Sequence, residues 1–338
     1  MYFLSEYATN RKRFNYVLIV LARKFKPSRV FAYPIKLTVC PGTVCNLECA
    51  LCPVGLKDKG REKGLMEFIT FKKVIDECGP YLYKLDLFNW GEPLLNKKIF
   101  KMVRYAKKFK IKVTISSNLK YFNEEICSGL IKSGVDHLIV SLDGTSQESV
   151  NKYQVGNNYK EVVSHIKKLV KKKKELNSIK PFIQWRFLLN RYNENEIETA
   201  KALVKEIGVD KLEIAIFRCD MGNELFYNSE KQFESVQKWL PKGEALSMYD
   251  YSKKMKKATK IKECSWLWTQ ATVNWNGSVS PCCAVWYEKF DVGNINRDSF
   301  WKIWNNKKYQ DARGINRGEH INAPGNICKT CYLNNAAI

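Results

Sequence analysis

The sequence predicts an α/β protein, a partial (βα)6 TIM-like barrel followed by a smaller C-terminal α+β domain. Two observations support this fold class. Through the first two thirds of the 338 residues, short apolar runs alternate with amphipathic segments of helical spacing, which is typical of a parallel sheet covered by helices. From residue 264 onward the pattern changes to short strand-like runs with glycines, and six of the nine tryptophans lie there.

The expected barrel elements follow one another in a regular order. Strands are expected at residues 35–40, 84–89, 112–116, 137–141, 182–189 and 211–217. Helices are expected at residues 68–77, 97–109, 124–132, 159–175 and 194–207. Six units of this kind make most of a barrel but not a complete one of eight. Gly-Val-Asp precedes a strand twice, at 134–136 and 208–210, where each glycine is expected to end a helix in the left-handed conformation.

The domain boundaries follow from the same pattern. The barrel is expected at residues 33–225, a Lys-rich helical connector at 226–262 and the smaller domain at 263–338. Residues 1–32 precede the barrel and are expected to carry a basic amphipathic helix.

The apolar residues of this first helix repeat at helical spacing: Phe14, Val17, Leu18, Leu21 and Phe25. Basic residues stand on both sides of the apolar run, at 11–13 and 23–26. The helix either packs against the barrel or rests on an anionic membrane surface. No segment is long and apolar enough to cross a bilayer. We therefore expect a cytoplasmic protein, which the second interpretation would make peripheral to the inner face of the membrane.

The chain is strongly basic. Its formal net charge of +23 and its pI of about 9.4 suit a polyanionic partner, which is nucleic acid, acidic lipid, or a phosphorylated or nucleotide-linked substrate. The lysines are spread along the chain, and the run at 171–174 is typical of a solvated helix face. The charge alone therefore does not choose among these partners.

Twelve cysteines are present, in one group near the start of the chain and one near its end. The first group, Cys45-x3-Cys49-x2-Cys52, places three thiols in one loop after the first strand. Structural zinc sites and four-iron clusters each take four ligands. This loop therefore needs a remote fourth ligand, or it leaves one iron open to a small molecule. A zinc loop completed by Cys40 is also compatible with the spacing.

Polar motifs follow four consecutive strands. The cysteine loop follows the first strand, Asn-Trp-Gly-Glu-Pro at 89–93 the second, Ser-Ser-Asn at 116–118 the third and Ser-Leu-Asp-Gly at 141–144 the fourth. Because the chemistry of parallel barrels lies at the carboxyl ends of the strands, these motifs are expected on one rim. Each motif alone is a common turn, and only the shared rim gives it a functional interpretation.

The second cysteine group consists of Cys264, Cys282, Cys328 and Cys331. Four thiols in two separated pairs match a closed metal site, which is either an iron–sulfur cluster or a zinc ribbon. The other cysteines are interpreted as small buried apolar residues: Cys40, Cys78, Cys127, Cys219 and Cys283.

The cysteine loop and Gly91-Glu92-Pro93 together resemble the radical S-adenosylmethionine (SAM) superfamily, over residues 34–217. The resemblance implies that Cys45, Cys49 and Cys52 bind a [4Fe–4S] cluster whose fourth iron binds SAM. It further implies SAM contacts from Leu51 near the adenine, from Gly91, Glu92 and Pro93 at the methionine ammonium, from Ser117, Asn118, Ser141 and Asp143 at the carboxylate and ribose, and from Arg186 at the carboxylate. Trp90 departs from the family, in which a glycine is common there, and is expected to reshape this part of the site.

The C-terminal cysteines resemble those of the SPASM or twitch domain, which carries auxiliary [4Fe–4S] clusters. A full SPASM domain has further cysteines beyond the position of Cys331, and none follow here. The resemblance therefore implies a single auxiliary cluster held by Cys264, Cys282, Cys328 and Cys331, and two clusters in all.

The resemblance also implies a reaction. An external reductant of flavodoxin or ferredoxin type reduces the first cluster, SAM is cleaved to a 5′-deoxyadenosyl radical, and the radical abstracts hydrogen from a substrate in the barrel. With the auxiliary cluster as electron acceptor, a net oxidation is expected. Similarity to an aminocyclitol dehydrogenase with one auxiliary cluster favours a sugar, cyclitol or nucleotide-linked sugar as the substrate.

Three other functions stay open. A peptide maturase is disfavoured because only 44 residues precede Cys45, fewer than the leader-binding domain of many such enzymes needs. An RNA-modifying enzyme is suggested by the charge alone. A zinc-stabilised binding protein without activity would leave the rim motifs unexplained. No general base or other catalytic residue is assigned, because neither His137 nor His320 has a distinctive spacing.

Overall fold

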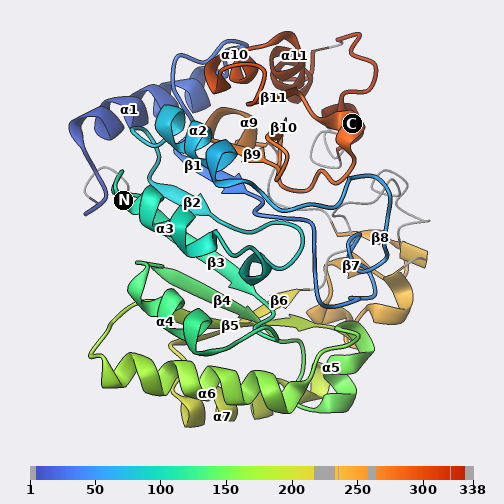
Figure 1. Ribbon diagram of the computed structural model, residues 1–338. Coiled ribbons are helices and arrows are strands. Elements are labelled where there is room, and N and C mark those ends of the chain that lie inside the picture. Colours follow the sequence, from blue (N-terminus) through green and yellow to red (C-terminus); the bar gives the residue numbers. More distant parts are fainter. Residues whose placement is uncertain (1–4, 217–232, 235, 258–263, 320, 332–338) are drawn as a thin grey trace.

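The residues that the structure describes form one nine-stranded sheet and a separate two-stranded one (Figure 1). The computed structural model describes residues 5–216, 233–234, 236–257, 264–319 and 321–331. Cys219 and His320 lie outside the described residues, as does Phe217 at the end of the last expected barrel strand. In the large sheet the strands run in the order β11-β10-β9-β1-β2-β3-β4-β5-β6.

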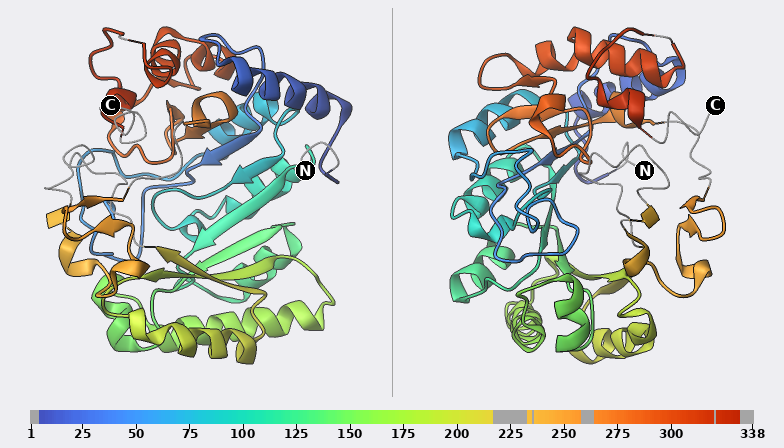
Figure 2. Two further views of the ribbon diagram at one scale, coloured as in Figure 1. Left: turned by 180° about the vertical axis from the view of Figure 1, so that it is seen from behind. Right: turned by 90° about the vertical axis from the view of Figure 1, so that its right-hand side faces the viewer.

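Six parallel strands in sequence order form the barrel part of this sheet. They are β1 (Lys36–Val39), β2 (Lys84–Asp86), β3 (Lys112–Ser117), β4 (His137–Ser141), β5 (Phe182–Leu189) and β6 (Lys211–Ile216). The helices that connect them are α2 (Phe68–Cys78), α3 (Ile99–Lys107), α4 (Glu124–Lys132), α5 (Gln147–Tyr153), α6 (Tyr159–Glu175) and α7 (Ile197–Ile207). These helices follow the outer side of the curved sheet (Figure 2). The predicted partial barrel is confirmed.

The two faces of the barrel strands differ in chemistry, because successive side chains of a strand point to opposite sides. Toward the helices the strands present fully buried aliphatic side chains: Leu37, Leu85, Val113, Leu138 and Ile183. Toward the inner face they present mostly polar side chains: Thr38, Asp86, Thr114, Ser116, Ser141, Gln184, Arg186 and Glu213. Parallel sheets covered by helices on both faces are apolar on both. The polar inner face is therefore suited to a ligand.

The C-terminal part continues this sheet instead of forming a sheet of its own. Its elements are α9 (Trp266–Thr269), β9 (Gln270–Val273), β10 (Ser278–Ser280), β11 (Gly293–Asn294), α10 (Phe300–Trp304) and α11 (Lys307–Asn316). β9 pairs in parallel with β1, with Ala271 opposite Leu37, and β10 and β11 then add antiparallel strands. Buried residues of this part and of the barrel belong to one apolar core. The expected smaller domain thus shares both sheet and core with the barrel.

C-terminal tryptophans anchor the segment between the first helix and β1. The indole of Trp268 donates to the carbonyl oxygen of Pro27 at 3.0 Å, and that of Trp304 donates to Ala32 at 3.0 Å. Each ring is buried and contributes a large apolar area together with one satisfied donor. This double role accounts for part of the concentration of tryptophans in the C-terminal part.

The two Gly-Val-Asp sequences perform the same structural task. Gly134 and Gly208 follow α4 and α7 with φ of 91° and 82°, a conformation that glycine adopts at little cost. The aspartate carboxylates then accept backbone N–H groups of a neighbouring strand, Asp136 from Val113 at 2.8 Å and Asp210 from Ile183 at 2.7 Å. Each sequence therefore ends a helix and fixes the start of the next strand against its neighbour.

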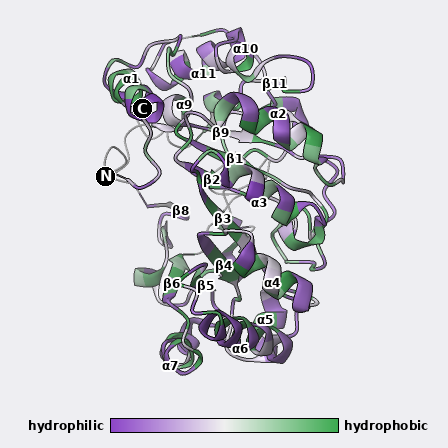
Figure 3. Ribbon diagram, turned by 60° about the vertical axis from the view of Figure 1, so that its left-hand side comes forward, coloured by the Kyte–Doolittle hydropathy of each residue, from purple (hydrophilic) through white to green (hydrophobic). Residues whose placement is uncertain are grey.

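The first helix, α1 (Asn10–Phe25), packs on the barrel through Lys12, Asn15, Ile19 and Ala22. The apolar positions that the sequence singles out are mostly on its other side, where they are exposed. α1 lies at the outer edge of the molecule, as the hydropathy colouring also shows (Figure 3). Among the residues that the structure describes, no helix is both long and apolar enough to span a bilayer.

The described part of the expected helical connector is mostly not helical. Residues 237–257 form two short 3-10 turns, Gln237–Trp239 and Glu244–Leu246, and a hairpin of β7 (Tyr249–Asp250) and β8 (Met255–Lys256). Apolar side chains of this segment, including Trp239 and Tyr249, form a small cluster against Leu51. The segment therefore lies against the cysteine loop.

Candidate functional site

The first cysteine loop follows β1 and is held in place by backbone hydrogen bonds. The amides of Glu48 and Ala50 donate at 3.0 Å to the carbonyls of Val155 and Tyr153, which lie at the end of α5 and just beyond it. Within the loop, the amide of Cys52 donates to Cys49 at 3.2 Å and that of Leu56 to Cys52 at 2.8 Å. The loop thus has a defined path that does not depend on its thiols.

Gly55 allows this loop to close tightly. A Cβ atom at this position would lie 2.5 Å from both the backbone nitrogen and the carbonyl oxygen of Cys49, so any other residue would displace the loop. The glycine requirement here comes from close backbone approach, which the spacing of the cysteines alone does not reveal.

The three thiols of the loop lie close enough to influence one another's ionisation. Burial raises the pKa of Cys45 to about 11, with smaller contributions from the charges of Glu92 and Cys52. Burial also raises the pKa of Cys49 well above its usual range, and Cys52, Asp143 and Cys45 add to the shift. Buried thiols that can become thiolates only with a compensating positive charge fit a metal cluster, whose irons supply that charge.

Glu92 connects the loops that follow β1, β2 and β3. Its buried carboxylate accepts hydrogen bonds from the Ser117 hydroxyl at 2.8 Å, from the Asn118 amide at 2.9 Å and from the Leu94 amide at 3.0 Å. Its own amide donates to the carbonyl oxygen of Val44 at 2.8 Å, next to Cys45. Burial raises the pKa of this carboxyl above its usual range. The structure therefore brings Glu92, Ser117 and Asn118 together, as the sequence predicts for one rim.

Gly91, just before Glu92, has a φ of 69°, and a Cβ there would lie 2.6 Å from the carbonyl oxygens of Gly42 and Val44. Only glycine allows this approach. The 3-10 turn Pro93–Leu95 follows and begins at the carboxylate of Glu92. The Gly-Glu-Pro sequence thus packs its backbone directly against the cysteine loop.

Asn118 completes the link to the cysteines. Its side-chain amide donates to the side-chain oxygen of Asn46 at 2.9 Å and approaches the Cys45 sulfur at 3.8 Å. A neutral N–H donor beside a thiolate is a common means of tuning an iron–sulfur cluster.

The fourth motif places Asp143 beneath the cysteine loop. Its carboxylate accepts the Leu188 amide at 2.9 Å, and burial raises its pKa to about 7. Ser141, at the end of β4, shares a hydrogen bond of 3.3 Å with Ser116 across the inner face. Asp143 and Ser141 therefore lie at the carboxyl end of β4, and the charge of Asp143 adds to the raised pKa of Cys49.

Arg186 and Leu51 have defined partners. The Arg186 Nε donates to Glu213 on β6 at 2.7 Å, and Gln184 donates to the same carboxylate oxygen at 2.6 Å. The guanidinium is about one-third exposed, so it stays accessible from the inner face while it is paired. Leu51 packs toward the apolar cluster around Trp239 and Tyr249.

The second cysteine group also gathers. Burial is the largest cause that raises the pKa of Cys282, and the charges of Cys283, Cys328 and Cys264 raise it further. Burial also raises the pKa of Cys328, and the charge of Cys331 adds to that shift. Cys264, Cys282 and Cys328 thus lie near one another, with Cys331 near Cys328 and Cys283 next to Cys282 in the chain. In the described residues, no three His, Cys, Asp or Glu side chains have the spacing of a single metal-ion site. A four-iron cluster takes one thiolate per iron and needs a wider spacing than one ion does.

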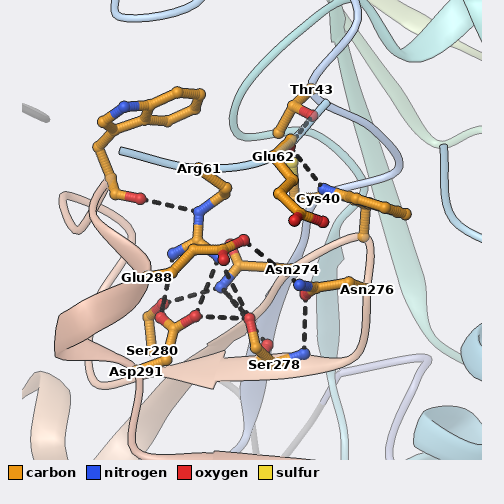
Figure 4. A network of polar contacts seen from close by, with 12 residues as sticks. Cys40, Thr43, Arg61, Glu62, Asn274, Asn276, Ser278, Ser280, Glu288 and Asp291 are labelled. Atoms are coloured by element: carbon orange, nitrogen blue, oxygen red, sulfur yellow. Dashed lines mark hydrogen bonds and ion pairs between the residues drawn. The ribbon is translucent and has the colours of Figure 1, made fainter. Parts of the chain in front are cut away.

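A buried network joins the two cysteine-bearing regions (Figure 4). Arg61, nine residues after Cys52, binds Asp291 through both terminal nitrogens at 2.9 and 3.0 Å. It also donates to the Ser278 hydroxyl at 3.2 Å and to the carbonyl oxygen of Trp286 at 2.8 Å. Asp58 accepts the Trp286 indole at 2.8 Å. The segment after the first loop is therefore fastened to the C-terminal strands.

Trp90 and Trp286 meet at this junction. Their rings are 5.3 Å apart and nearly perpendicular, and they form a buried cluster with Cys40 and Val54 against which Cys45 and Cys52 pack. The side chain of the adjacent Asn89 donates to the carbonyl oxygen of Cys283 at 3.1 Å. The loop after β2 thus contacts both cysteine groups. Trp90 therefore packs between Trp286 and the side chains of the first cysteine loop.

Sequence reasoning missed Arg61, Asp58, Asp291 and Trp286. None of them belongs to a motif, and their partners are more than 200 residues away in the chain. The available signal was compositional: arginine is favoured in buried bidentate pairs, and Arg61 stands among lysines in a glycine-rich loop.

Comparison with known families gives two matches. The model described as "Radical SAM superfamily" matches residues 39–204, and SPASM, described as "Iron-sulfur cluster-binding domain", matches residues 264–332. Both cysteine groups fall within these ranges.

Individual relatives have low sequence identity to this chain but match most of its length. The chain is 24% identical, over 318 residues, to the "Tungsten-containing aldehyde ferredoxin oxidoreductase cofactor-modifying protein" of Pyrococcus furiosus; the match covers 86% of this chain and 85% of the relative. Among solved structures, SuiB of Streptococcus suis bound to precursor peptide SuiA has a TM-score of 0.64 at 16% identity, with 95% of this chain and 74% of SuiB covered. BtrN in complex with AdoMet and 2-DOIA has a TM-score of 0.53 at 18% identity, with 88% and 92% covered. At these identities the structures establish the fold alone.

Proposed function

Because the chain belongs to the radical SAM superfamily and carries a SPASM domain, we propose that it oxidises a hydroxyl-rich small molecule held against the inner face of its sheet. The substrate class is a sugar, cyclitol or nucleotide-linked sugar. The cofactors of the enzyme are SAM and [4Fe–4S] clusters. When bound, the first cluster and SAM supply a hydrogen-atom acceptor, and an auxiliary cluster supplies a one-electron acceptor.

In this proposal each cysteine group has one task. Cys45, Cys49 and Cys52 hold the first cluster, with SAM at the remaining iron. Cys264, Cys282, Cys328 and Cys331 hold one auxiliary cluster with no open position. The soft thiolate donors and their partial burial suit iron–sulfur clusters, and both groups lie within the matched domains.

The residues of the rim bind and orient SAM. Glu92 and the backbone of Gly91 and Pro93 hold the methionine ammonium, because the buried carboxylate offers an anionic acceptor beside the cysteine loop. Ser117, Asn118, Ser141 and Asp143 bind the carboxylate and ribose, and Arg186 reaches the carboxylate while Glu213 holds its Nε. Leu51 lies at the adenine, with the apolar cluster of Trp239 and Tyr249 behind it to exclude water.

The polar inner face carries the substrate assignment. Beside Ser141 and Arg186, which bind SAM in this proposal, Glu213 stands opposite Arg186 on β6. Ser116 lies within hydrogen-bond reach of Ser141, and Gln184 within reach of Glu213. Hydroxyl, amide and charged groups of this kind bind substrate hydroxyls and discriminate against analogues that lack them. A hydroxyl-rich ligand can satisfy this surface, and an apolar one cannot.

The contact between the two cysteine regions supports a net oxidation. Asn89 donates to Cys283, and Trp90 packs on Trp286, so the auxiliary site adjoins the loops that bind SAM. A nearby acceptor allows the substrate to lose an electron and a proton after it has lost a hydrogen atom, which converts an alcohol to a ketone.

A second candidate is suggested by the Pyrococcus furiosus protein, which is similar along most of both chains and is named as cofactor-modifying. In this alternative the substrate is a cofactor precursor. A peptide substrate is a further alternative, suggested by the similarity in fold to SuiB.

The test compares substrates directly. Anaerobically reconstituted, reduced protein is incubated with SAM and, separately, with nucleotide-linked sugars, cyclitols, pterin-type cofactor precursors and peptides. We expect a sugar or cyclitol to raise the yield of 5′-deoxyadenosine and to give a product two mass units lighter. Faster cleavage only with a cofactor precursor or a peptide would overturn the substrate assignment. The Cys45→Ser variant is the matched control and should form no 5′-deoxyadenosine.

A further inference from the structure

Helix α1 is fixed to the barrel by one face. The Lys12 ammonium donates to the carbonyl oxygens of Phe109 at 2.8 Å and Lys110 at 2.7 Å, and the Asn15 side chain exchanges hydrogen bonds with the backbone of Tyr33 at 2.9 and 2.8 Å. Ile19 and Ala22 are buried on the same side. These contacts set the rotation of the helix about its axis, so its other face has a defined direction.

That other face is apolar and exposed. Phe14 and Phe25 are each 68% exposed, Val17 is 46% exposed and Leu21 is 45% exposed. At 100° per residue the four positions lie on one side of the helix, one turn after another. Scattered apolar side chains are ordinary on protein surfaces, but a continuous row from Phe14 to Phe25 of a sixteen-residue helix is typical of a binding surface.

The charges around this row have a single sign. α1 contains no aspartate or glutamate. Arg11 and Lys24 are exposed and Arg13 is partly exposed beside the apolar row, and Arg23 is exposed farther around the helix. Arg23 and Lys24 lie in the last turn, where positive charge also stabilises the helix dipole. The face therefore combines apolar and cationic groups. It suits a partner whose surface presents apolar and anionic groups side by side.

We propose that this face of α1, made of Phe14, Val17, Leu21 and Phe25, docks the protein on an anionic lipid bilayer. The helix lies parallel to the surface, with the phenylalanines among the acyl chains and the flanking arginines and lysine at the lipid phosphates. Nucleic acid would use the charges but not the phenylalanine row. A second copy that used the same face would bring two sets of cations together, which opposes such a dimer.

Vesicle sedimentation of the full chain tests the proposal. We expect binding to vesicles of phosphatidylcholine and phosphatidylglycerol at 3:1, at least about tenfold tighter than to phosphatidylcholine alone, and weakened by ~0.5 M salt. The Phe14→Ser, Phe25→Ser double variant should lose at least about tenfold in vesicle binding. The Ile179→Ser variant removes an apolar side chain that is 84% exposed elsewhere and should bind as the wild type does.

Two further measurements make the outcome decisive. Unchanged thermal unfolding of the double variant shows that its loss of binding is not a loss of fold. Binding that survives the double substitution overturns the assignment to α1. Absence of vesicle binding by the wild type, with a dimer in analytical ultracentrifugation that the double variant breaks, assigns the face to a second copy instead. Absence of both overturns the proposal, and neither result bears on SAM cleavage.

Discussion

Arg61 and Asp291, 230 residues apart in the chain, form a bidentate ion pair with contacts of 2.9 and 3.0 Å. The guanidinium is fully buried, and the carboxylate is nearly so. Ser278 and Ser280 donate to the same carboxylate at 2.6 and 2.5 Å, so Asp291 has partners for both oxygens. The pair fastens the segment after the first cysteine loop to β10 and the chain around it.

Replacement of Arg61 by Ala should lower the free energy of unfolding by about 3–5 kcal/mol, because it leaves a buried carboxylate without its cation. Urea unfolding of the metal-free protein, followed by tryptophan fluorescence, measures this change. Lys72→Ala, which breaks the exposed Lys72–Asp76 pair, is the matched control and should change stability little. A small effect of Arg61→Ala would mean that water replaces the guanidinium.

Asp136 should make the free energy of unfolding depend on pH in the acidic range. Burial acts to raise the pKa of this carboxyl, but hydrogen bonds from Lys107, Lys180 and Tyr7 outweigh it and hold the pKa below its usual range. A carboxyl with a lower pKa in the folded than in the unfolded chain stabilises the fold above its unfolded pKa of about 3.9. This stabilisation is lost as the pH falls through the folded pKa.

The Asp136→Asn variant should therefore be less stable than the wild type by about 2 kcal/mol at pH 7, with the difference shrinking below pH ~4. Urea unfolding at a series of pH values measures it. Asp210→Asn changes the other Gly-Val-Asp sequence, where the carboxylate is more exposed and has one cation, Lys173, so its cost should be smaller. A difference that does not change with pH would assign the effect of Asp136 to geometry alone.

Glu92 should affect the binding of SAM more than the binding of the first cluster. Both of its oxygens accept hydrogen bonds, and the Gln of a Glu92→Gln variant would turn an N–H group toward either Asn118 or Ser117. We expect SAM affinity, measured by equilibrium dialysis, to fall at least about tenfold, which corresponds to 1.4 kcal/mol. Iron content should stay unchanged. Ser117→Ala removes one hydrogen bond and should cost less. Loss of iron along with SAM would make Glu92 a support of the cysteine loop instead.

The two cysteine groups should hold their iron independently. With Cys45, Cys49 and Cys52 replaced by Ala, about half of an expected eight irons should stay bound, and 5′-deoxyadenosine should no longer form. The matched variant replaces Cys264 and Cys282 and should keep the other half. Iron analysis and electron paramagnetic resonance of the reduced protein measure both. Retained SAM cleavage in the triple variant would refute the assignment of the first group.

The sequence predicted what depends on local patterns. Strand β5 matches its expected range because apolar residues and flanking turns mark both of its ends, and the rim motifs follow their strands as expected. The parallel pairing of β9 with β1 was not predictable, because the partners Leu37 and Ala271 are far apart in the chain and leave no local signal. The sheet shared by the barrel and the C-terminal part therefore has no counterpart in the local sequence pattern.

The orientation of α1 was also beyond the sequence pattern. Most of the apolar residues that the pattern singles out point outward. Lys12 and Asn15, which the pattern assigns to the solvent, instead find backbone partners in the barrel. A buried lysine with two carbonyl acceptors depends on tertiary structure, which hydrophobic periodicity does not register.

The contact between Trp90 and Trp286 should couple the two regions energetically. The rings pack edge to face at 5.3 Å, a geometry that contributes about 0.5–1.5 kcal/mol beyond the burial of area. In a double-mutant cycle of Trp90→Leu and Trp286→Leu, the costs should therefore sum to more than the cost of the double variant, by about 1 kcal/mol. Urea unfolding of the metal-free protein measures the four species.

A cycle of Trp286→Leu with Tyr105→Leu is the control. Tyr105 packs with Phe68 and Phe109 against the main core, away from Trp286, so the two costs should add without coupling. If the Trp90–Trp286 cycle is additive too, the two rings merely fill space, and the junction between the cysteine groups rests on Arg61 and Asn89. Coupling of the expected size would show instead that the tryptophan beside Gly91 holds the C-terminal cysteine region against the rim.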